Sequence, residues 1–190
     1  MILIVGLGNP QPQYSNTRHN LGVLVVNLLV RSVSNGQEIK WKNWRSQASI
    51  TKLKVNEQEV KVALPLSFMN ESGKVVAKLI NYLKIPTANL WVIHDDLDLP
   101  FGNIRVSWQA SSAGHRGVES IIENLGVADF WRFRLGIGRP TSDIATDKFV
   151  LQPFTNEEKD KLPFFLTKTV NRIKLSLQEG PRLTIHKYND

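Results

Sequence analysis

Apolar residues occur along the chain in two arrangements, short continuous runs and longer stretches at helical spacing. Residues 1–7 form an apolar run ended by glycines, which predicts a buried strand. Residues 8–18 contain two prolines and several turn formers, so they predict a loop. From Asn20 onward apolar residues recur at helical spacing as far as Leu29, and we expect a helix there with Asn20 as its cap.

The same alternation continues to the end of the chain. Runs typical of strands lie at about 47–55, 59–64, 90–93, 103–108 and 131–137, with a polar turn at 56–58 and a flexible loop at 111–114. Helical spacing recurs in three places: in a segment bearing Val76, Leu79, Ile80 and Leu83 that ends by Pro86, at 117–125, and at about 157–179. The inward face of the last helix is predicted to carry Leu162, Phe165, Leu166, Val170, Ile173 and Leu177.

Strands that alternate with helices, interrupted by short hairpins, indicate an α/β fold. We expect a mixed central β-sheet flanked by helices in a three-layer arrangement, and a single domain over residues 1–190. The composition agrees with this, because 42% hydrophobic and 22% charged residues are ordinary values for a soluble globular protein.

The composition also removes several kinds of chemistry. The chain has no cysteine, so disulfides, a cysteine nucleophile and thiolate metal sites are excluded. No apolar run approaches the roughly 20 residues that span a bilayer, and the N-terminus lacks the features of a signal peptide. We therefore expect a cytoplasmic protein without membrane contact.

The charge favours a polyanionic partner. The 24 lysines and arginines exceed the 17 acidic residues and give a net charge of +7. Each phosphate that such a surface neutralises releases counterions, which favours nucleic-acid binding. Many basic proteins bind nothing acidic, however, so charge alone names no partner.

The glycines near the N-terminus do not form a dinucleotide site. Gly6 and Gly8 follow a predicted strand, but the third glycine and the immediate helix start of that fingerprint are missing. We expect the glycines to allow a tight turn that brings Asn9 into a cleft. The sequence also lacks the GxSxG, HExxH and P-loop motifs. A hydrolase built on this chain would therefore have to activate water directly.

Two polar segments are candidates for that chemistry. His19 lies in a loop before a helix, where it either projects into a cleft or stays in solvent. The string HDDLD at residues 94–98 follows a strand, at the edge where α/β sheets place their ligands. One of its carboxylates could orient a histidine, several could bind a divalent metal, or they could form a turn that bonds its own backbone. The spacing does not choose among these three.

The second half of the chain concentrates basic residues. The string SSAGHRG at residues 111–117 is either a mobile lip over a cleft or a turn before a helix. Arg132 and Arg134 share a face if residues 131–137 are a strand. The arginines either form a solvated row or bind a ligand: Arg105, Arg116, Arg132, Arg134 and Arg139.

Taken in order, several strings resemble those of bacterial peptidyl-tRNA hydrolases, and the resemblance covers nearly the whole chain. They are IVGLGNP, Tyr14, TRHN, SFMNESG, HDDLDLPFG, SAGHRG and RLGIGRP. The resemblance implies a monomeric α/β enzyme that hydrolyses the ester between the peptide and the tRNA of peptidyl-tRNA, and so recycles tRNA from aborted translation. It implies no metal and no other cofactor.

The resemblance also implies a role for individual residues. His19 would activate a water molecule that Asp95 helps to hold, and Asn9 would help to distinguish N-blocked substrates from free aminoacyl-tRNA. The 3′ end and the peptide would lie against Tyr14, Phe68 and Asn70. Arg105 and Arg134 match a basic pair that grips the 5′ phosphate of the tRNA, and a further lysine of that clamp corresponds to Ser107 here.

One position departs from the family pattern. Many members have asparagine where this chain has Arg116, and arginine cannot accept a hydrogen bond from water. We expect Arg116 to contact the substrate in a different way, by gripping a phosphate or stacking on the terminal adenosine. The alternative is a non-catalytic RNA-binding homologue, of the splicing-factor type, that keeps the fold. The presence of His19, Asp95, Asn9 and Asn70 together argues against it.

Overall fold

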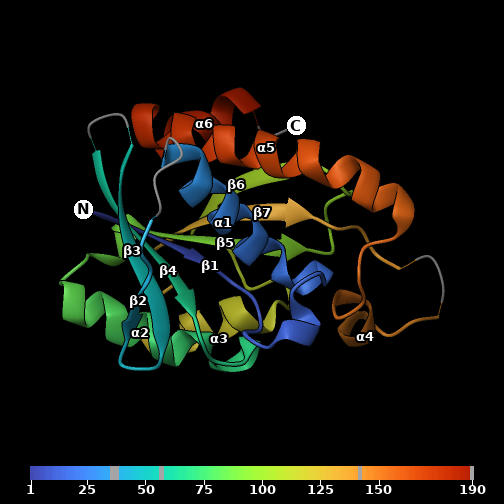
Figure 1. The fold of residues 1–190 in the computed structure, drawn as a ribbon, viewed down its shortest axis with the longest axis horizontal. Coiled ribbons are helices and arrows are strands. Elements are labelled where there is room, and N and C mark those ends of the chain that lie inside the picture. Colours follow the sequence, from blue (N-terminus) through green and yellow to red (C-terminus); the bar gives the residue numbers. More distant parts are fainter. Residues whose placement is uncertain (35–38, 56–57, 141–142, 189–190) are drawn as a thin grey trace.

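The computed structural model of the chain describes residues 1–34, 39–55, 58–140 and 143–188. Within this part, seven strands form one mixed sheet in the order β2-β3-β4-β1-β5-β7-β6 (Figure 1). The strands are β1 (Ile2–Gly6), β2 (Lys42–Trp44), β3 (Ala48–Val55), β4 (Gln58–Pro65), β5 (Leu90–Asp96), β6 (Ile104–Trp108) and β7 (Trp131–Gly136). The four central strands β4, β1, β5 and β7 are parallel, and the outer pairings are antiparallel.

Helices cover both faces of the sheet, so the expected three-layer α/β fold is confirmed (Figure 1). α1 (Leu21–Val33) and α5 (Asn156–Glu179) pack on one face, and α2 (Ser72–Leu83) and α3 (Arg116–Leu125) on the other. Side chains of β1 alternate between the two cores, because successive residues of a strand point to opposite faces. None of the described helices is long and apolar enough to cross a membrane.

Most predicted elements are present, with small differences at their ends. β5 is longer than the apolar run that predicts it, because His94, Asp95 and Asp96 continue the strand. Gln58, predicted as part of a turn, begins β4 instead, and the other two residues of that turn, 56–57, lie outside the described residues. The predicted inward face of α5 is buried or half-buried. The sequence pattern gave no sign of β2, of α4 (Thr146–Val150) or of α6 (Pro181–Tyr188).

Gly6, the last residue of β1, and Gly8, two residues further on, allow close packing and do not form the tight turn that we expected. Neither Gly6 nor Gly8 has a positive φ. A Cβ atom on Gly6 would lie 2.6 Å from the carbonyl oxygen of Gly22 in α1, and one on Gly22 would lie 2.3 Å from the carbonyl oxygen of Ile93 in β5. The first turn of α1 therefore rests directly on the backbone of the sheet.

Asn20 precedes α1 as expected, but its side chain makes no capping hydrogen bond. Its amide instead bridges to the loop after β1, where Oδ1 accepts from the Asn9 N–H at 2.8 Å and Nδ2 donates to the Asn9 carbonyl at 2.9 Å. Asn20 thus stands at the N-cap position, as predicted, but its side chain does not cap the helix because a tertiary partner uses both ends of the amide. This contact fixes the loop that carries Asn9 against the start of α1.

Candidate active site

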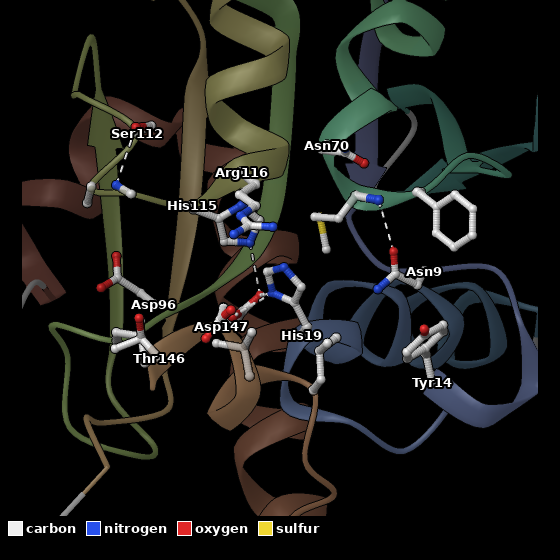
Figure 2. Close-up of a pocket in the computed structure, with 18 residues that line it drawn as sticks. Asn9, Tyr14, His19, Asn70, Asp96, Ser112, His115, Arg116, Thr146 and Asp147 are labelled. Atoms are coloured by element: carbon white, nitrogen blue, oxygen red, sulfur yellow. Dashed lines mark hydrogen bonds and ion pairs between the residues drawn. The ribbon is translucent and has the colours of Figure 1, made fainter. Parts of the chain in front are cut away.

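A cavity of about 410 Å³ opens at the carboxyl ends of the parallel strands (Figure 2). In open α/β sheets this edge is where ligands bind, at the point where neighbouring connections run in opposite directions. Here β1 lies between β4 and β5, and the segments that follow all three strands line the cavity. The remaining walls come from the turn before α3 and from α4.

Seven of the nine predicted site residues line this one cavity: Asn9, Tyr14, His19, Phe68, Asn70, Asp95 and Arg116. They come from sequence positions more than 100 residues apart. Arg105 and Arg134 do not line the cavity and lie beside each other on β6 and β7.

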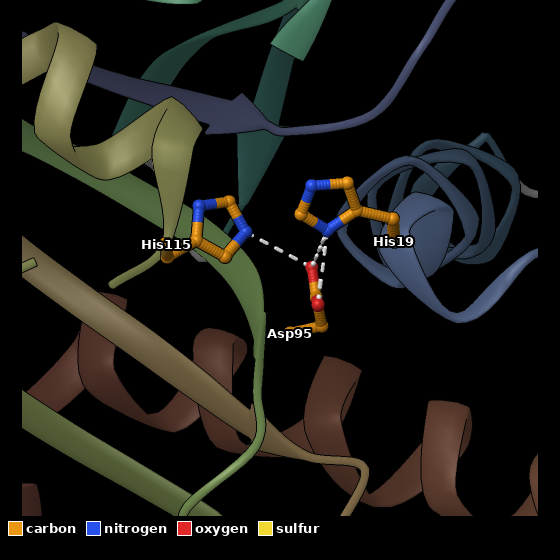
Figure 3. Close-up of side chains that lie close together, drawn as sticks. All are labelled: His19, Asp95 and His115. Atoms are coloured by element: carbon orange, nitrogen blue, oxygen red, sulfur yellow. Dashed lines mark hydrogen bonds and ion pairs between the residues drawn. The ribbon is translucent and has the colours of Figure 1, made fainter. Parts of the chain in front are cut away.

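His19 and Asp95 form the buried floor of the cavity. His19 lies in the short 3-10 turn Arg18–Asn20, which leads directly into α1, and α1 is packed closely on the sheet. Its Nδ1 atom is 3.0 Å from both carboxylate oxygens of Asp95, which lies near the end of β5 (Figure 3). His19 is therefore not the solvated loop histidine that the sequence left possible.

His115 is a third member of this group that the sequence did not single out. Its Nε2 atom lies 3.0 Å from Oδ1 of Asp95, so one carboxylate bonds two imidazoles (Figure 3). Its Nδ1 atom caps α3 by accepting from the N–H groups of Gly117 and Val118. Because Nδ1 accepts, the proton of His115 is assigned to Nε2, and the ring donates to Asp95 in its neutral form.

The contacts of Asp95 keep it ionised. Burial by itself would raise the pKa of Asp95, but the two imidazoles of His19 and His115 outweigh burial and hold that pKa well below its usual range. An ionised Asp95 accepts the Nδ1–H of His19. The Nε2 lone pair of His19 is then left as the acceptor of the ring, the form needed to take a proton from water.

His94 stands behind this group. Its Nδ1 atom lies 2.7 Å from the Asp95 carbonyl oxygen, and its ring packs edge-on against His115 at 4.7 Å between centroids. Burial, reinforced by the nearby His115 and Arg132, holds the pKa of His94 well below its ordinary value. His94 therefore stays neutral and adds no charge beside Asp95.

Asn9 presents an amide donor to the cavity. Its Oδ1 atom accepts the backbone N–H of Met69 at 2.9 Å, which fixes the amide so that Nδ2 is turned away from Met69 (Figure 2). Since the N–H of Met69 can only donate, the orientation of the amide follows from this bond. Asn9 is thus held rigidly from two sides, by Met69 and by Asn20.

The carboxylates of the HDDLD string separate instead of converging. Asp95 bonds the two histidines, Asp96 accepts from Arg134 Nε at 2.5 Å, and Asp98 pairs with Arg139 at 2.6 Å. The multi-carboxylate metal site that the sequence left open is therefore wrong for this string. The donor atoms of His19, Asp95 and His115 do lie within 4.8 Å of one another, which is close enough to hold a metal ion. Their mutual hydrogen bonds account for that closeness without one.

The arginines divide into buried and exposed members. Arg132 is 1% exposed, donates to the carbonyl oxygen of Ala110 and lies over the Phe130 ring, so it is not part of a solvated row. Burial, together with the neighbouring Arg134, lowers the pKa of Arg132 to about 10. Arg105 is exposed and directly opposite Arg134 in the β6–β7 pairing.

Arg18 anchors the turn that carries His19, which sequence reasoning missed. Its guanidinium bonds both carboxylate oxygens of Glu158, at 2.7 and 3.2 Å, and the carbonyl oxygen of Pro153 at 3.0 Å. It also lies over the Phe149 ring, 4.2 Å from the centroid. Glu158 in turn belongs to the capping box of α5. Because Arg18 and Glu158 are 140 residues apart, no local pattern could have revealed their contact.

The far wall of the cavity was also unexpected. It is formed by α4 and the residue after it, which contribute Thr146, Asp147, Val150 and Leu151. A helix of five residues is too short to show a hydrophobic period, so the sequence carries no signal for this wall.

Comparison with known proteins finds similar proteins over nearly the whole chain. The family model for peptidyl-tRNA hydrolase matches residues 3–190. The peptidyl-tRNA hydrolase of Thermodesulfovibrio yellowstonii is 40% identical, with 100% of this chain and 99% of the relative covered. That of Herpetosiphon aurantiacus is 42% identical, with 100% and 90% covered. The crystal structure of the Acinetobacter baumannii peptidyl-tRNA hydrolase matches with a TM-score of 0.88 at 29% identity, covering 99% of this chain and 95% of that one.

Proposed function

The chain belongs to the peptidyl-tRNA hydrolase family, and we propose that the cavity over His19 is where it hydrolyses the ester between peptide and tRNA. One observation carries this proposal. A histidine whose Nδ1 atom is bonded to a buried, ionised Asp95 leaves Nε2 as a base at the floor of an open cavity.

In the proposed step His19 Nε2 takes a proton from a water molecule as the water oxygen attacks the ester carbonyl carbon. The bond from the tetrahedral carbon to the 3′ oxygen of the terminal ribose then breaks, and that oxygen takes the proton that His19 removed from the water. Asp95 stabilises the imidazolium that forms in between, because its charge is fixed 3.0 Å from Nδ1. The products are a free peptide carboxylate and a tRNA with its 3′ hydroxyl restored.

Asn9 supports the same step through its Nδ2 donor, which makes no hydrogen bond within the described residues. The carbonyl oxygen of the ester gains negative charge in the intermediate, and a fixed donor aimed at it lowers the barrier. Because Met69 and Asn20 hold Asn9 in place, this donor needs no reorientation. The resemblance to the family assigns Asn9 a part in choosing N-blocked substrates, and the same amide can donate to a peptide carbonyl.

The catalytic demand is modest for an ester. General-base assistance is worth roughly 10²–10⁴-fold, and holding water and substrate in register adds more. The proposed step uses neither a metal nor another cofactor, so hydrolysis is predicted to continue in the presence of a chelator.

The remaining site residues have binding roles in this proposal. Tyr14, Phe68 and Asn70 line the cavity and would contact the 3′ end and the peptide. Phe68 is 48% exposed, which leaves its ring free to pack against a substrate. Outside the cavity, Arg105 and Arg134 would bind the 5′ phosphate of the tRNA. The tRNA would therefore extend from the cavity across β7 and β6.

Arg116 has a place in the cavity that suits substrate binding. It begins α3, its side chain is exposed, and it has no hydrogen bond or ion pair within the described part of the chain. A cation at a helix N-terminus is unfavourable by itself, because the helix dipole is positive there. We expect a phosphate near the 3′ end of the tRNA to offset that cost.

Besides the roles of the individual site residues, three sequence predictions remain to be tested: a monomer, a single domain over residues 1–190, and a cytoplasmic location. Nothing in the described residues favours the alternative of a non-catalytic RNA-binding protein, because the full set of predicted catalytic residues lies in one cavity.

The decisive test is hydrolysis of N-acetyl-aminoacyl-tRNA by the purified protein in the presence of EDTA. We expect rapid release of the N-acetyl-amino acid, and much slower release of the amino acid from unblocked aminoacyl-tRNA. Tight binding of both RNAs without hydrolysis would instead support the RNA-binding alternative.

A further inference from the structure

Asp96 is fixed at the end of β5, next to Asp95 in sequence but on the opposite face of the sheet. It is 5% exposed and reaches the edge of the cavity. Its Oδ1 atom accepts the backbone N–H of Asp98 at 2.8 Å, and its Oδ2 atom accepts from Nε of Arg134 at 2.5 Å. Both oxygens are thus in use, and the carboxylate has little freedom to turn.

The bond from Asp96 reaches only one side of the Arg134 guanidinium. Within the described part of the chain, Arg134 makes no hydrogen bond through its two Nη groups, and its side chain is 17% exposed. A guanidinium held through Nε keeps its outer edge free, and that edge matches two oxygens of a phosphate. Arg105 lies directly opposite on β6. Its side chain is exposed and makes no hydrogen bond or ion pair among the described residues.

Two like charges directly opposite each other in a sheet are unfavourable unless something compensates them. The carboxylate of Asp96 compensates the charge of Arg134. The charge of Arg105 remains for a ligand that carries at least one negative charge. A terminal phosphate monoester, with up to two charges and three free oxygens, fits this arrangement better than a phosphodiester of the RNA backbone.

We propose that Asp96 is a positioning residue that holds Arg134 in the orientation needed to bind the terminal 5′ phosphate of the tRNA. This inference rests on the proposed function, in which Arg105 and Arg134 meet that phosphate. Without Asp96 the long Arg134 side chain has to be ordered when the tRNA binds, and ordering such a side chain weakens binding by about 2- to 10-fold. The residue acts on recognition of the phosphate, while Asp95 beside it acts on the chemistry.

The test compares two substitutions that remove the same charge. Asp96→Asn keeps an oxygen for the N–H of Asp98 and loses the charged partner of Arg134. Asp98→Asn is the matched control, because Asp98 lies two residues away and pairs with the exposed Arg139 instead. Each protein is assayed on N-acetyl-aminoacyl-tRNA with and without its 5′ phosphate. The measured quantity is the ratio of kcat/KM for the two substrates.

We expect the 5′ phosphate to improve kcat/KM in the wild type, and Asp96→Asn to reduce that improvement about 3- to 10-fold through KM. Neither kcat nor the rate on the dephosphorylated substrate should change more than about twofold. The ratio isolates the terminal phosphate, because the added positive charge of the variant attracts both RNAs alike. Asp98→Asn should leave the ratio unchanged.

Each failure has a different meaning. An unchanged ratio in Asp96→Asn, together with a lost ratio in Arg134→Ala, would overturn the role of Asp96 and leave the phosphate grip intact. If kcat/KM of the wild type does not depend on the 5′ phosphate, binding of that phosphate by Arg105 and Arg134 is refuted, and so is the role of Asp96. The proposed hydrolysis would not be affected by this result. Equal loss of kcat on both substrates in Asp96→Asn would place Asp96 in the chemistry and also contradict the proposal.

Discussion

The two ends of the site differ in how far their polar groups are already satisfied. Around His19 each functional group has a partner before any substrate arrives: Asp95 bonds two imidazoles, Asn9 is fixed from two sides, and the turn below is anchored by Arg18. At the other end the Arg105 side chain is exposed and, among the described residues, unpartnered, and the same holds for Arg116, which lies in the cavity between the two ends. Only Arg134 there is held, through Asp96.

This difference fits the roles that we propose for the two ends. A proton transfer needs donor and acceptor in place before the reaction, because reorganisation adds to the barrier. Binding a polyanion needs the opposite, since cations already neutralised by the protein release few counterions from RNA. In the proposed function, the unpaired charges lie where the tRNA would supply their partners, and the paired groups lie where the chemistry would occur. Substitutions at the two ends should therefore fail in different ways.

At the end of the site around His19, where the polar groups are already paired, the largest effect is expected for Asp95→Asn. Loss of the carboxylate removes the acceptor that fixes the Nδ1–H of His19, and the charge that stabilises the imidazolium. Loss of the aspartate in other histidine–aspartate pairs costs up to about 10⁴-fold in rate, and we expect a fall of about 10²–10⁴-fold in kcat here. Single-turnover rates and tRNA affinities measured together will show it. A rate within tenfold of the wild type, or a parallel loss of tRNA binding, would contradict the separation of catalysis around His19 from tRNA binding at the other end.

At the end of the site around Arg105 and Arg134, Arg134→Ala should weaken tRNA binding about tenfold and leave the rate at saturation nearly unchanged. The reason is loss of a charge-assisted contact to phosphate. The slope of log Kd against log salt concentration should become shallower by about 1. Arg139→Ala is the control, because it removes the same charge from an exposed arginine that neither lines the cavity nor lies opposite Arg105. Equal slopes for the wild type and Arg134→Ala would refute the proposed contact between Arg134 and a phosphate.

Arg116 tests where the two ends meet. Arg116→Ala should raise KM about 3- to 5-fold with kcat changed less than twofold, since we assign the side chain to a phosphate near the 3′ end. Arg31→Ala, an exposed arginine in the last turn of α1, should change neither. Steady-state kinetics at two salt concentrations will separate them. If Arg116→Ala leaves both turnover and KM unchanged, Arg116 has no part in the site.

The smallest effect concerns stability and the neutral histidine behind Asp95. Burial holds the pKa of His94 well below its ordinary value of about 6.5, so below that pH the unfolded chain binds a proton that the folded chain does not. Stability should therefore fall as the pH drops below about 6.5, by up to about 1.4 kcal/mol per pH unit from this group. Urea unfolding of the wild type and His94→Gln between pH 7.5 and 5.5 measures this. The variant should show the shallower decline, and identical declines would mean that His94 is not held neutral.

The sequence predicted the parts of this molecule that depend on local pattern or on shared strings. Short apolar runs located six of the strands, and the ordered strings placed His19 and Asp95 in one site and identified the family. What failed depends on contacts between distant segments. The Asn20 amide bonds Asn9 and does not cap its own helix, and Gly6 packs against α1 where we expected a turn. The Arg18–Glu158 pair and the second imidazole on Asp95 appear only once the chain is folded.

We propose above all that His19 activates water at a site whose polar groups are in place before the substrate binds. The most direct measurement is the single-turnover hydrolysis of N-acetyl-aminoacyl-tRNA by the wild type and His19→Ala at saturating enzyme, with tRNA affinity measured on the same proteins. We expect the rate to fall by about 10²–10⁴-fold while the Kd for tRNA changes less than threefold. A variant that still hydrolyses within tenfold of the wild type would contradict this account, because the base would then have to be another group.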